Sequence, residues 1–311
     1  MTYPRAHLIN PEGGVYHVCS RCVRRAWLCG TDELTGYNFD HRRDWLEQRI
    51  LKLADVFAID LYGYAVMSNH YHIVLRVDPA KVARWSNEEV AERWQFVCPS
   101  YSKLEDRKLR ELHKRALLED TERVLELRQR LASLSWFMRF INEPLARLAN
   151  NEDNCTGRFW EGRFKSQQLL DENAILAAMV YVDLNPVRAD IANDVTEAKY
   201  TSLHKRLTQS QDDKPLTAIN PPHAALPFDY TLADYIELAH WTVSAQQHKQ
   251  SEPSKRIPLH KSSQSTLLWI DHYLPTPGHW QRANGSFQAL KDYARDIGQR
   301  WIKTRSLHLH Q

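Results

Sequence analysis

The sequence lacks any hydrophobic run long enough to cross a bilayer. No apolar segment follows the first residues, Met1 to Arg5, so no signal peptide is expected. Cysteine is scarce and odd in number, with five in 311 residues. Cys19 and Cys22 form one Cys-x-x-Cys pair without a second, and we interpret this spacing as coincidence rather than as half of a zinc site. We therefore expect a soluble, cytoplasmic protein with reduced thiols.

A strong charge of one sign is also missing. The chain has 41 Lys and Arg against 38 Asp and Glu, and a net charge of +3 does not by itself indicate a nucleic-acid partner. Basic residues nevertheless gather in two places, one of them interleaved with aromatic residues, as suits phosphate contact and base stacking on single-stranded DNA. The DNA-contact candidates in these clusters are Arg21, Arg24, Arg25, Arg158, Trp160, Arg163 and Lys165. The alternative for each cluster is a solvated basic face beside aromatic core residues.

Two histidines stand in a segment that has the pattern of a β-strand. His70 and His72 lie in the run from Met67 to Leu75, which is apolar and β-prone. Because side chains alternate along a strand, both imidazoles project from one face while Tyr71 projects from the other. Two convergent imidazoles are part of a metal site that needs further ligands, and ordinary surface or hydrogen-bonded histidines are the alternative.

A second chemically distinctive segment covers residues 177–188. It follows Asp-Glu-Asn at 171–173, which can cap and start a helix. In such a helix Tyr181 and Asn185 are four residues apart and share one face, and Pro186 ends or kinks the helix just beyond them. A phenol and an amide oxygen therefore emerge together near the helix end. The alternative is a tyrosine packed in the core and an asparagine that only caps the helix.

Together the two segments suggest a reactive site. Two imidazoles and an amide carbonyl can hold a divalent ion, and a tyrosine hydroxyl can attack a group that the ion polarises. A free phenol has a pKa of about 10, so it needs a Lewis acid and close positioning to react near neutral pH. A phosphodiester is the natural target, and the expected product is a covalent phosphotyrosine.

Four motifs follow one another in a characteristic order. They are Val15-Tyr16-His17-Val18 with Ser20-Arg21, the run from Gly63 to His72, the run from Gly157 to Ser166, and the run from Tyr181 to Arg188. Through these motifs, residues 14–207 resemble the single-tyrosine HUH transposases, most closely the REP-associated tyrosine transposase type. Four ordered motifs are far more specific than any one of them.

The resemblance implies roles for individual residues. It makes His70, His72 and Asn185 the ligands of a magnesium or manganese ion, whereas ligand softness alone would favour zinc or manganese. It makes Tyr181 the nucleophile that cleaves single-stranded or hairpin DNA, keeps the 5′ phosphate and releases a 3′ hydroxyl that can reverse the attack. Arg188, at the end of the fourth motif, joins the DNA-binding candidates. The resemblance favours a self-contained monomer and leaves a dimer open.

The order of expected elements fits an α+β fold. Strands are expected at 14–21, 57–67, 70–77 and 163–170, and helices at 39–55, 134–149 and about 172–185. This order matches a ferredoxin-like antiparallel sheet with packed helices, the core of HUH endonucleases. Such a fold brings the histidine strand and the tyrosine helix together. Pro144 falls inside the second helix and is expected to kink it.

The rest of the chain is expected to extend this core. Residues 1–207 are the predicted catalytic domain, with a helical insertion at about 80–132 that either touches DNA or only covers the sheet. A polar linker at 208–230 leads to a small, mainly helical accessory region at 231–311. That region either adds DNA affinity or is structural.

Three functions remain in view. The combined motifs favour an enzyme that cleaves and rejoins DNA at hairpin-forming repeats. A catalytically silent, domesticated DNA-binding regulator is the first alternative. A metal-dependent hydrolase is the second, because His-x-His at a strand end also occurs in barrel amidohydrolases, but the repeated strand and helix units of that fold are not seen in the sequence.

Overall fold

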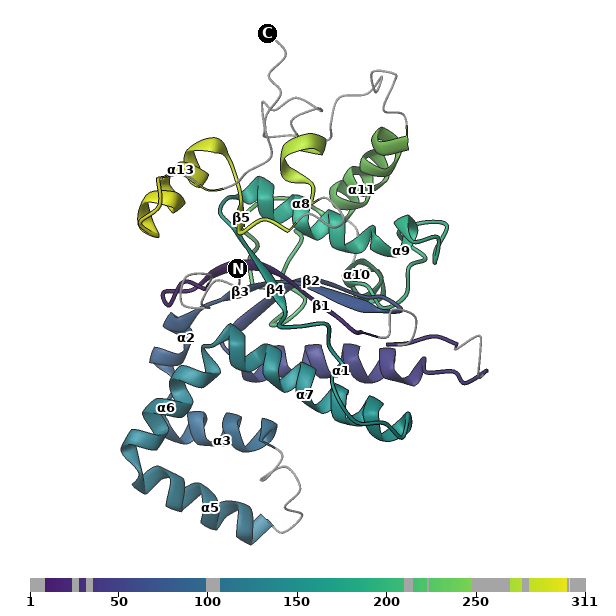
Figure 1. The fold of residues 1–311 in the computed structure, drawn as a ribbon. Helices are drawn as coiled ribbons and strands as arrows, with labels where there is room; N and C mark the ends of the chain where they lie inside the picture. Colours follow the sequence, from purple (N-terminus) through teal and green to yellow (C-terminus); the bar gives the residue numbers. More distant parts are fainter. Residues whose placement is uncertain are drawn as a thin grey trace.

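The computed structural model describes residues 9–23, 28–31, 36–98, 107–209, 215–222, 224–247, 269–275, 280–300 and 302. Its centre is a sheet with the strand order β2-β3-β1-β4-β5 (Figure 1). The strands are β1 (Gly14–Arg21), β2 (Ile59–Val66), β3 (His70–Val77), β4 (Lys165–Leu169) and the short β5 (Ala283–Asn284). The first four pair antiparallel in the order of a ferredoxin-like sheet, and β5 is added parallel to β4. The expected α+β fold is confirmed, whereas the added strand was not foreseen.

Helices cover both faces of the sheet. On one face lie α1 (His41–Val56) and α7 (Leu134–Glu152), and on the other lie α8 (Glu172–Asp183), α10 (Ser202–Gln209) and α11 (Leu232–Gln247) (Figure 1). Strand alternation divides the core between these layers, because Tyr71 and Ile73 of β3 join the cluster under α1 and α7 while Val74 joins the cluster under α8. His70 and His72 therefore face α8.

The tyrosine helix α8 begins with a clear cap and is buried on all sides. The Asp171 side chain accepts a hydrogen bond from the Ala174 N–H at 2.9 Å, and Glu172 suits the positive end of the helix. The helix ends at Asp183, two residues before the expected end, and α9 (Asn185–Arg188) follows after Leu184. Because β2 has a glycine at position 63, α8 and α10 can pack close to this strand. A Cβ at that position would lie 3.2 Å from the Ser202 Oγ of α10.

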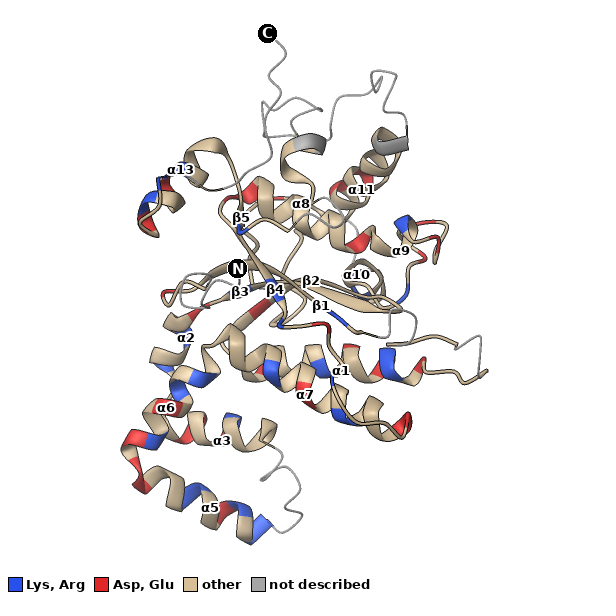
Figure 2. Ribbon diagram, in the orientation of Figure 1, with Lys and Arg blue, Asp and Glu red and all other residues tan. Residues whose placement is uncertain are grey.

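The insertion consists of short helices rather than one long element. They are α2 (Pro79–Arg84), α3 (Asn87–Val97), α5 (Arg107–Glu119) and α6 (Thr121–Leu131). The expected helical insertion is divided where the Asp120 and Ser133 side chains each cap a new helix. Lys and Arg alternate with Asp and Glu along α5 and α6 (Figure 2). The helix α7 runs through Pro144 to Glu152, three residues beyond its expected end.

The C-terminal half of the chain packs against the core. In the segment expected to be a linker, the Ile219 N–H donates to the Leu61 carbonyl of β2 at 2.8 Å, and the Leu61 N–H donates to the Asn220 carbonyl at 2.7 Å. Tyr235 of α11 and Trp269, in the π-helical turn η2 (Trp269–Tyr273), lie in the same cluster as α8. The division into domains stays a prediction. None of the helices in the described part of the chain is long and apolar enough to span a membrane.

Candidate functional site

Two aromatic groups from distant parts of the sequence meet above the sheet. The Tyr181 ring from α8 lies edge-on to the His72 ring from β3, with centroids 5.7 Å apart and an interplanar angle of 88°. The His70 and His72 rings are 4.9 Å apart. The structure thus brings together the imidazole pair and the phenol that the sequence analysis singled out. Tyr181 as a whole is only 6% exposed.

Asn185 and Arg188 lie on α9, directly beyond the tyrosine helix. The Asn185 Nδ2 donates to the Tyr181 carbonyl at 2.9 Å, and this bond fixes the orientation of the amide. The Arg188 guanidinium lies over the Tyr181 ring at 4.8 Å. Both residues therefore surround the same tyrosine, and a cation so close to a phenol favours its ionised form.

A third histidine, His17, completes the group; it stands in the first of the four motifs, but no role was assigned to it from the sequence. It lies on β1, is fully buried, and its Nε2 is 2.9 Å from the His72 Nδ1. Its ring centroid is 5.8 Å from that of Tyr181. A usable signal was present, because alternation along residues 14–21 places His17 on the same face as Arg21, and the antiparallel partner of Arg21 is His70.

Burial keeps the imidazoles of this group neutral. It lowers the pKa of His17 to about 3, and burial followed by the charge of Arg21 lowers the pKa of His70 to about 4. The pKa of His72 is lowered well below its usual range, first by burial and then by the other two histidines. Neutral imidazoles keep a nitrogen lone pair, which is the form that binds metal ions.

The tyrosine is held in its protonated form. Burial raises the pKa of Tyr181 above its ordinary value, and the charge of Arg188 works in the opposite direction. Burial lowers the pKa of Arg188 in turn. The neutral phenol is therefore the predominant form near neutral pH.

The two imidazoles lie close enough together to reach one divalent ion. The Nδ1 of His70 is 2.5 Å from the Asn69 Oδ1, so it carries the proton and leaves Nε2 as the donor atom. The 4.9 Å between the two rings is compatible with imidazoles on one ion at bond lengths of about 2.1 Å. In the described part of the chain, no group of three or more His, Cys, Asp or Glu side chains is suited to hold a metal ion. The expected set needs only two such side chains and takes its third donor from Asn185.

The tautomer of His72 depends on His17. If the Nδ1 of His72 carries the proton, it donates to His17, and Nε2 can bind a metal ion. If His17 is the donor, Nε2 of His72 carries the proton and cannot bind the ion. Under either assignment the His17 Nδ1 is buried without a hydrogen-bond partner. His17 is therefore placed to decide whether His72 can act as a ligand.

Hydrogen bonds on the far face of the sheet support the histidine strand. Tyr71, which lies between the two histidines, donates from its hydroxyl to the Asn142 Oδ1 at 2.7 Å. Asn142 of α7 in turn donates from Nδ2 to the Ser20 Oγ of β1 at 3.0 Å, and its carbonyl accepts a bond from the Trp160 Nε1 at 2.9 Å. These bonds fix β1 and β3 relative to α7.

The tyrosine helix is fixed from the other side by a buried carboxylate. Asp183 accepts hydrogen bonds from the Ser202 Oγ at 2.6 Å, the Leu203 N–H at 2.9 Å and the Tyr235 hydroxyl at 2.7 Å. Burial raises the pKa of this carboxyl, and the charge of Arg206 opposes the shift. The end of α8 that carries Tyr181 is therefore held by residues from α10 and α11.

A tryptophan from the C-terminal region lies against the imidazoles. The ring of Trp280 is 4.8 Å from that of His17 and is stacked at 6.5 Å and 17° on that of His72. The backbone just beyond it follows β4, where the Gln168 N–H donates to the Arg282 carbonyl at 2.9 Å. No local pattern in the sequence predicts this contact, because it depends on the chain returning to β4 more than a hundred residues later.

The predicted DNA-contact residues fall into two groups. Arg21 and Lys165 are exposed at one end of the sheet, where Arg21 is paired with His70 and Lys165 with Cys19. The structure brings these two and Arg188 to the histidine face. Arg24 and Arg25 lie outside the described residues.

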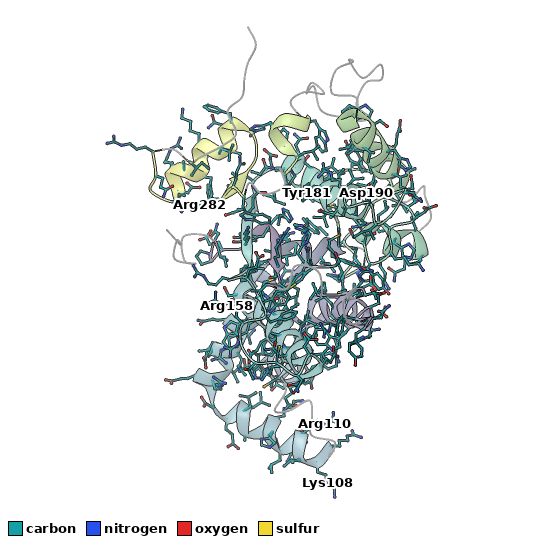
Figure 3. All side chains as sticks on the ribbon, turned by 45° about the vertical axis from the view of Figure 1, so that its right-hand side comes forward. Lys108, Arg110, Arg158, Tyr181, Asp190 and Arg282 are labelled. Carbon is teal, nitrogen blue, oxygen red and sulfur yellow. The ribbon has the colours of Figure 1, made fainter. Side chains whose placement is uncertain are left out.

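The second group is not at the histidine face. Arg158 and Arg163 are exposed in the segment that leads from α7 to β4. Trp160 packs behind the sheet, with its ring 5.9 Å from that of Tyr71. Figure 3 shows Arg158 well below Tyr181, on the side of the molecule where α7 lies. These residues can contact DNA only beyond the immediate surroundings of Tyr181.

Comparison with known proteins gives one finding. No protein-family model and no curated protein matches the sequence. Among solved structures, one match is a REP-associated tyrosine transposase bound to a REP hairpin, with 13% sequence identity and a TM-score of 0.40. The match covers 74% of this chain and 97% of that chain. A TM-score this low carries no argument about function.

Proposed function

We propose that this chain is an HUH-type enzyme that cleaves and rejoins single-stranded DNA through a 5′-phosphotyrosine intermediate, at repeats that form hairpins. One observation carries the proposal: the Tyr181 ring lies 5.7 Å from that of His72, the second histidine of a His-x-His strand. Exposed Arg21 and Lys165 beside the histidines supply positive charge for a phosphate backbone.

In the proposed reaction the phenolic oxygen of Tyr181 attacks a phosphorus atom of the strand. The bond from phosphorus to the 3′ oxygen breaks, the 5′ phosphate stays on the tyrosine, and the proton lost by the phenol is balanced by the proton gained at the 3′ oxygen. Attack by that 3′ hydroxyl reverses the step and rejoins the strand without an external energy source. Arg188, over the phenol ring, stabilises negative charge as it develops on the oxygen.

The residues that would hold a magnesium or manganese ion are His70, His72 and Asn185. When bound, the ion would polarise the phosphate and balance the charge of the transition state. The Nδ2 of Asn185 is occupied by the Tyr181 carbonyl, so the amide oxygen is the donor that it offers. His17 orients His72, and Asn69 orients His70.

A second candidate function is DNA binding without cleavage. The observation that favours it is the cover over the site: Tyr181 is 6% exposed, and Trp280 lies on His17 and His72. A strand can reach the phenol only if this cover moves. Formation of a covalent adduct separates the two functions.

The test is incubation with hairpin oligonucleotides that carry single-stranded flanks, with and without manganese. The enzyme should form a protein-DNA adduct that survives denaturing electrophoresis, and Tyr181→Phe should not. Tyr230→Phe is the matched control, because Tyr230 is buried to a similar degree, at 8% exposure, but its ring packs against that of Phe228, at 5.7 Å, rather than against a histidine. Binding of the hairpin without any adduct would support the silent regulator instead.

A further inference from the structure

A cavity lies on the face of the sheet opposite Tyr181, between α7 and the segment that leads to β4. Its volume is about 610 Å³, which is within the range of ligand-binding pockets. We call it the α7 cavity, and its main lining side chains are Trp136, Arg139, Arg147, Trp160, Arg163 and Phe164. The functional site described above uses none of this space.

The walls of the α7 cavity are aromatic and are held in place. Trp160 donates its indole N–H to the Asn142 carbonyl at 2.9 Å, and its ring packs at 4.9 Å on that of Phe159. Trp136 packs against Phe140 with ring centroids 6.1 Å apart. Arg130 and Arg139 already lie over the Trp136 ring, at 4.2 and 4.9 Å, so a further ring would stack against the Trp160 and Phe164 walls.

The rim of the cavity carries excess positive charge. Arg139, Arg147 and Arg163 line it, against the single carboxylate of Glu143. Glu143 accepts from Arg139 at 3.0 Å and is 3.1 Å from Arg147, and both arginines remain more than half exposed. Flat apolar walls beneath a cationic rim complement a nucleobase attached to a phosphate backbone.

The cavity and the tyrosine site lie at the same end of the sheet. Tyr71 contacts Trp160 on one face, while its neighbours His70 and His72 project from the other. The segment around Trp160 continues the edge of β1, because the Val23 N–H donates to the Phe159 carbonyl at 2.8 Å and the Glu161 N–H donates to the Arg21 carbonyl at 2.9 Å. A strand leaving Tyr181 past Arg21 would therefore reach the cavity around this end.

We propose that the α7 cavity binds one unpaired nucleobase of the single-stranded segment that flanks the cleavage site, with its phosphates against the rim arginines. The inference rests on the proposed function and adds a second point at which the strand is held. Asn142, beside the cavity, already uses its amide and its carbonyl in bonds to Ser20, Tyr71 and Trp160. Asn142 therefore has no amide group left to read a base, and the proposed contact is stacking, which tolerates different bases.

The test measures hairpin affinity in the absence of metal, so that no cleavage occurs, with each flanking nucleotide replaced in turn by an abasic one. At one position the abasic replacement should weaken the affinity of the wild-type protein about tenfold, which corresponds to about 1.4 kcal/mol of stacking free energy. Phe164→Leu should weaken binding of the intact strand by a similar factor. In that variant the abasic replacement should cause no further loss of affinity. Phe96→Leu, on α3 and half exposed, is the matched control and should bind like the wild type.

A second variant tests the rim. Arg147→Gln should weaken binding and reduce the slope of log Kd against log salt by about one. Arg76→Gln, exposed at the opposite end of β3 from His70, should leave both values unchanged. Thermal melting of each variant shows whether it is folded.

The outcomes separate this inference from the proposed function. Two results would overturn the nucleobase site and leave the cleavage proposal standing. The first is tight hairpin binding with no flanking position at which an abasic nucleotide weakens it. The second is a double change, Phe164→Leu with the abasic nucleotide, whose loss of affinity equals the product of the two single losses. No hairpin binding by the wild type would overturn both.

Discussion

Replacement of His17 by phenylalanine should weaken metal binding although His17 is not a proposed ligand. Among the described residues, His17 makes its polar contact through Nε2, which lies 2.9 Å from the His72 Nδ1, while its Nδ1 is buried without a hydrogen-bond partner. Without this acceptor, the tautomer of His72 that can bind a metal ion, with its proton on Nδ1, would have a buried N–H without a partner, which costs about 1–3 kcal/mol. That range corresponds to a loss of about 5- to 150-fold in affinity, and it overlaps the 10- to 100-fold that removal of such a partner typically costs.

The measurement is titration of the DNA-free protein with manganese, followed by the electron paramagnetic resonance signal of the free ion. His17→Gln keeps an oxygen that can accept the His72 N–H and should retain most of the affinity. Manganese binding by His17→Phe at the wild-type affinity, in a protein that melts normally, would refute the tautomer argument. Equal losses in both variants would assign the effect to packing.

Three further predictions concern the same groups. His70→Ala with His72→Ala should abolish metal-dependent cleavage while hairpin affinity, measured by fluorescence anisotropy, changes little; undiminished cleavage would exclude these ligands. Burial lowers the pKa of His17 to about 3, so at mildly acidic pH the unfolded chain binds a proton at this residue and the folded chain does not. The contribution of His17 to the free energy of unfolding is therefore present above its unfolded pKa and is lost as pH falls. Between about pH 6.5 and about pH 4.5 the metal-free protein should lose about 2–3 kcal/mol through this residue, and a urea-unfolding profile of His17→Phe that falls as steeply would contradict it. Tyr235→Phe removes a donor at 2.7 Å from the buried Asp183 carboxylate and should lower the free energy of unfolding by about 1–3 kcal/mol; an unchanged urea midpoint would show that this bond does not hold α8.

Local patterns in the sequence predicted the elements that carry the candidate site. The strand at 14–21 and the strand at 70–77 have the expected bounds, because a short β-prone run is a strong signal. The helix that carries Tyr181 begins where Asp171 was expected to cap it. The end of this helix and the points at which the insertion divides into separate helices depend on single capping contacts. A sequence pattern locates such helix ends only to within a few residues.

Contacts made over long sequence distances could not be read from local patterns. His17 could have been found from the face it shares with Arg21, but its bond to His72 depends on the register of β1 and β3. Trp280 over the imidazoles and Asn220 on β2 depend on where the C-terminal half returns to the core. The roles assigned to the site residues remain predictions, and Tyr181 is more deeply buried than a helix-end nucleophile suggests.

The most direct test of the central claim is to locate the covalent bond. After reaction of the enzyme with a hairpin oligonucleotide and manganese, nuclease and protease digestion followed by tandem mass spectrometry should find a nucleotide 5′ phosphate attached to Tyr181. A nucleotide attached through its 5′ phosphate to any other residue, or efficient cleavage without any covalent intermediate, would contradict the account.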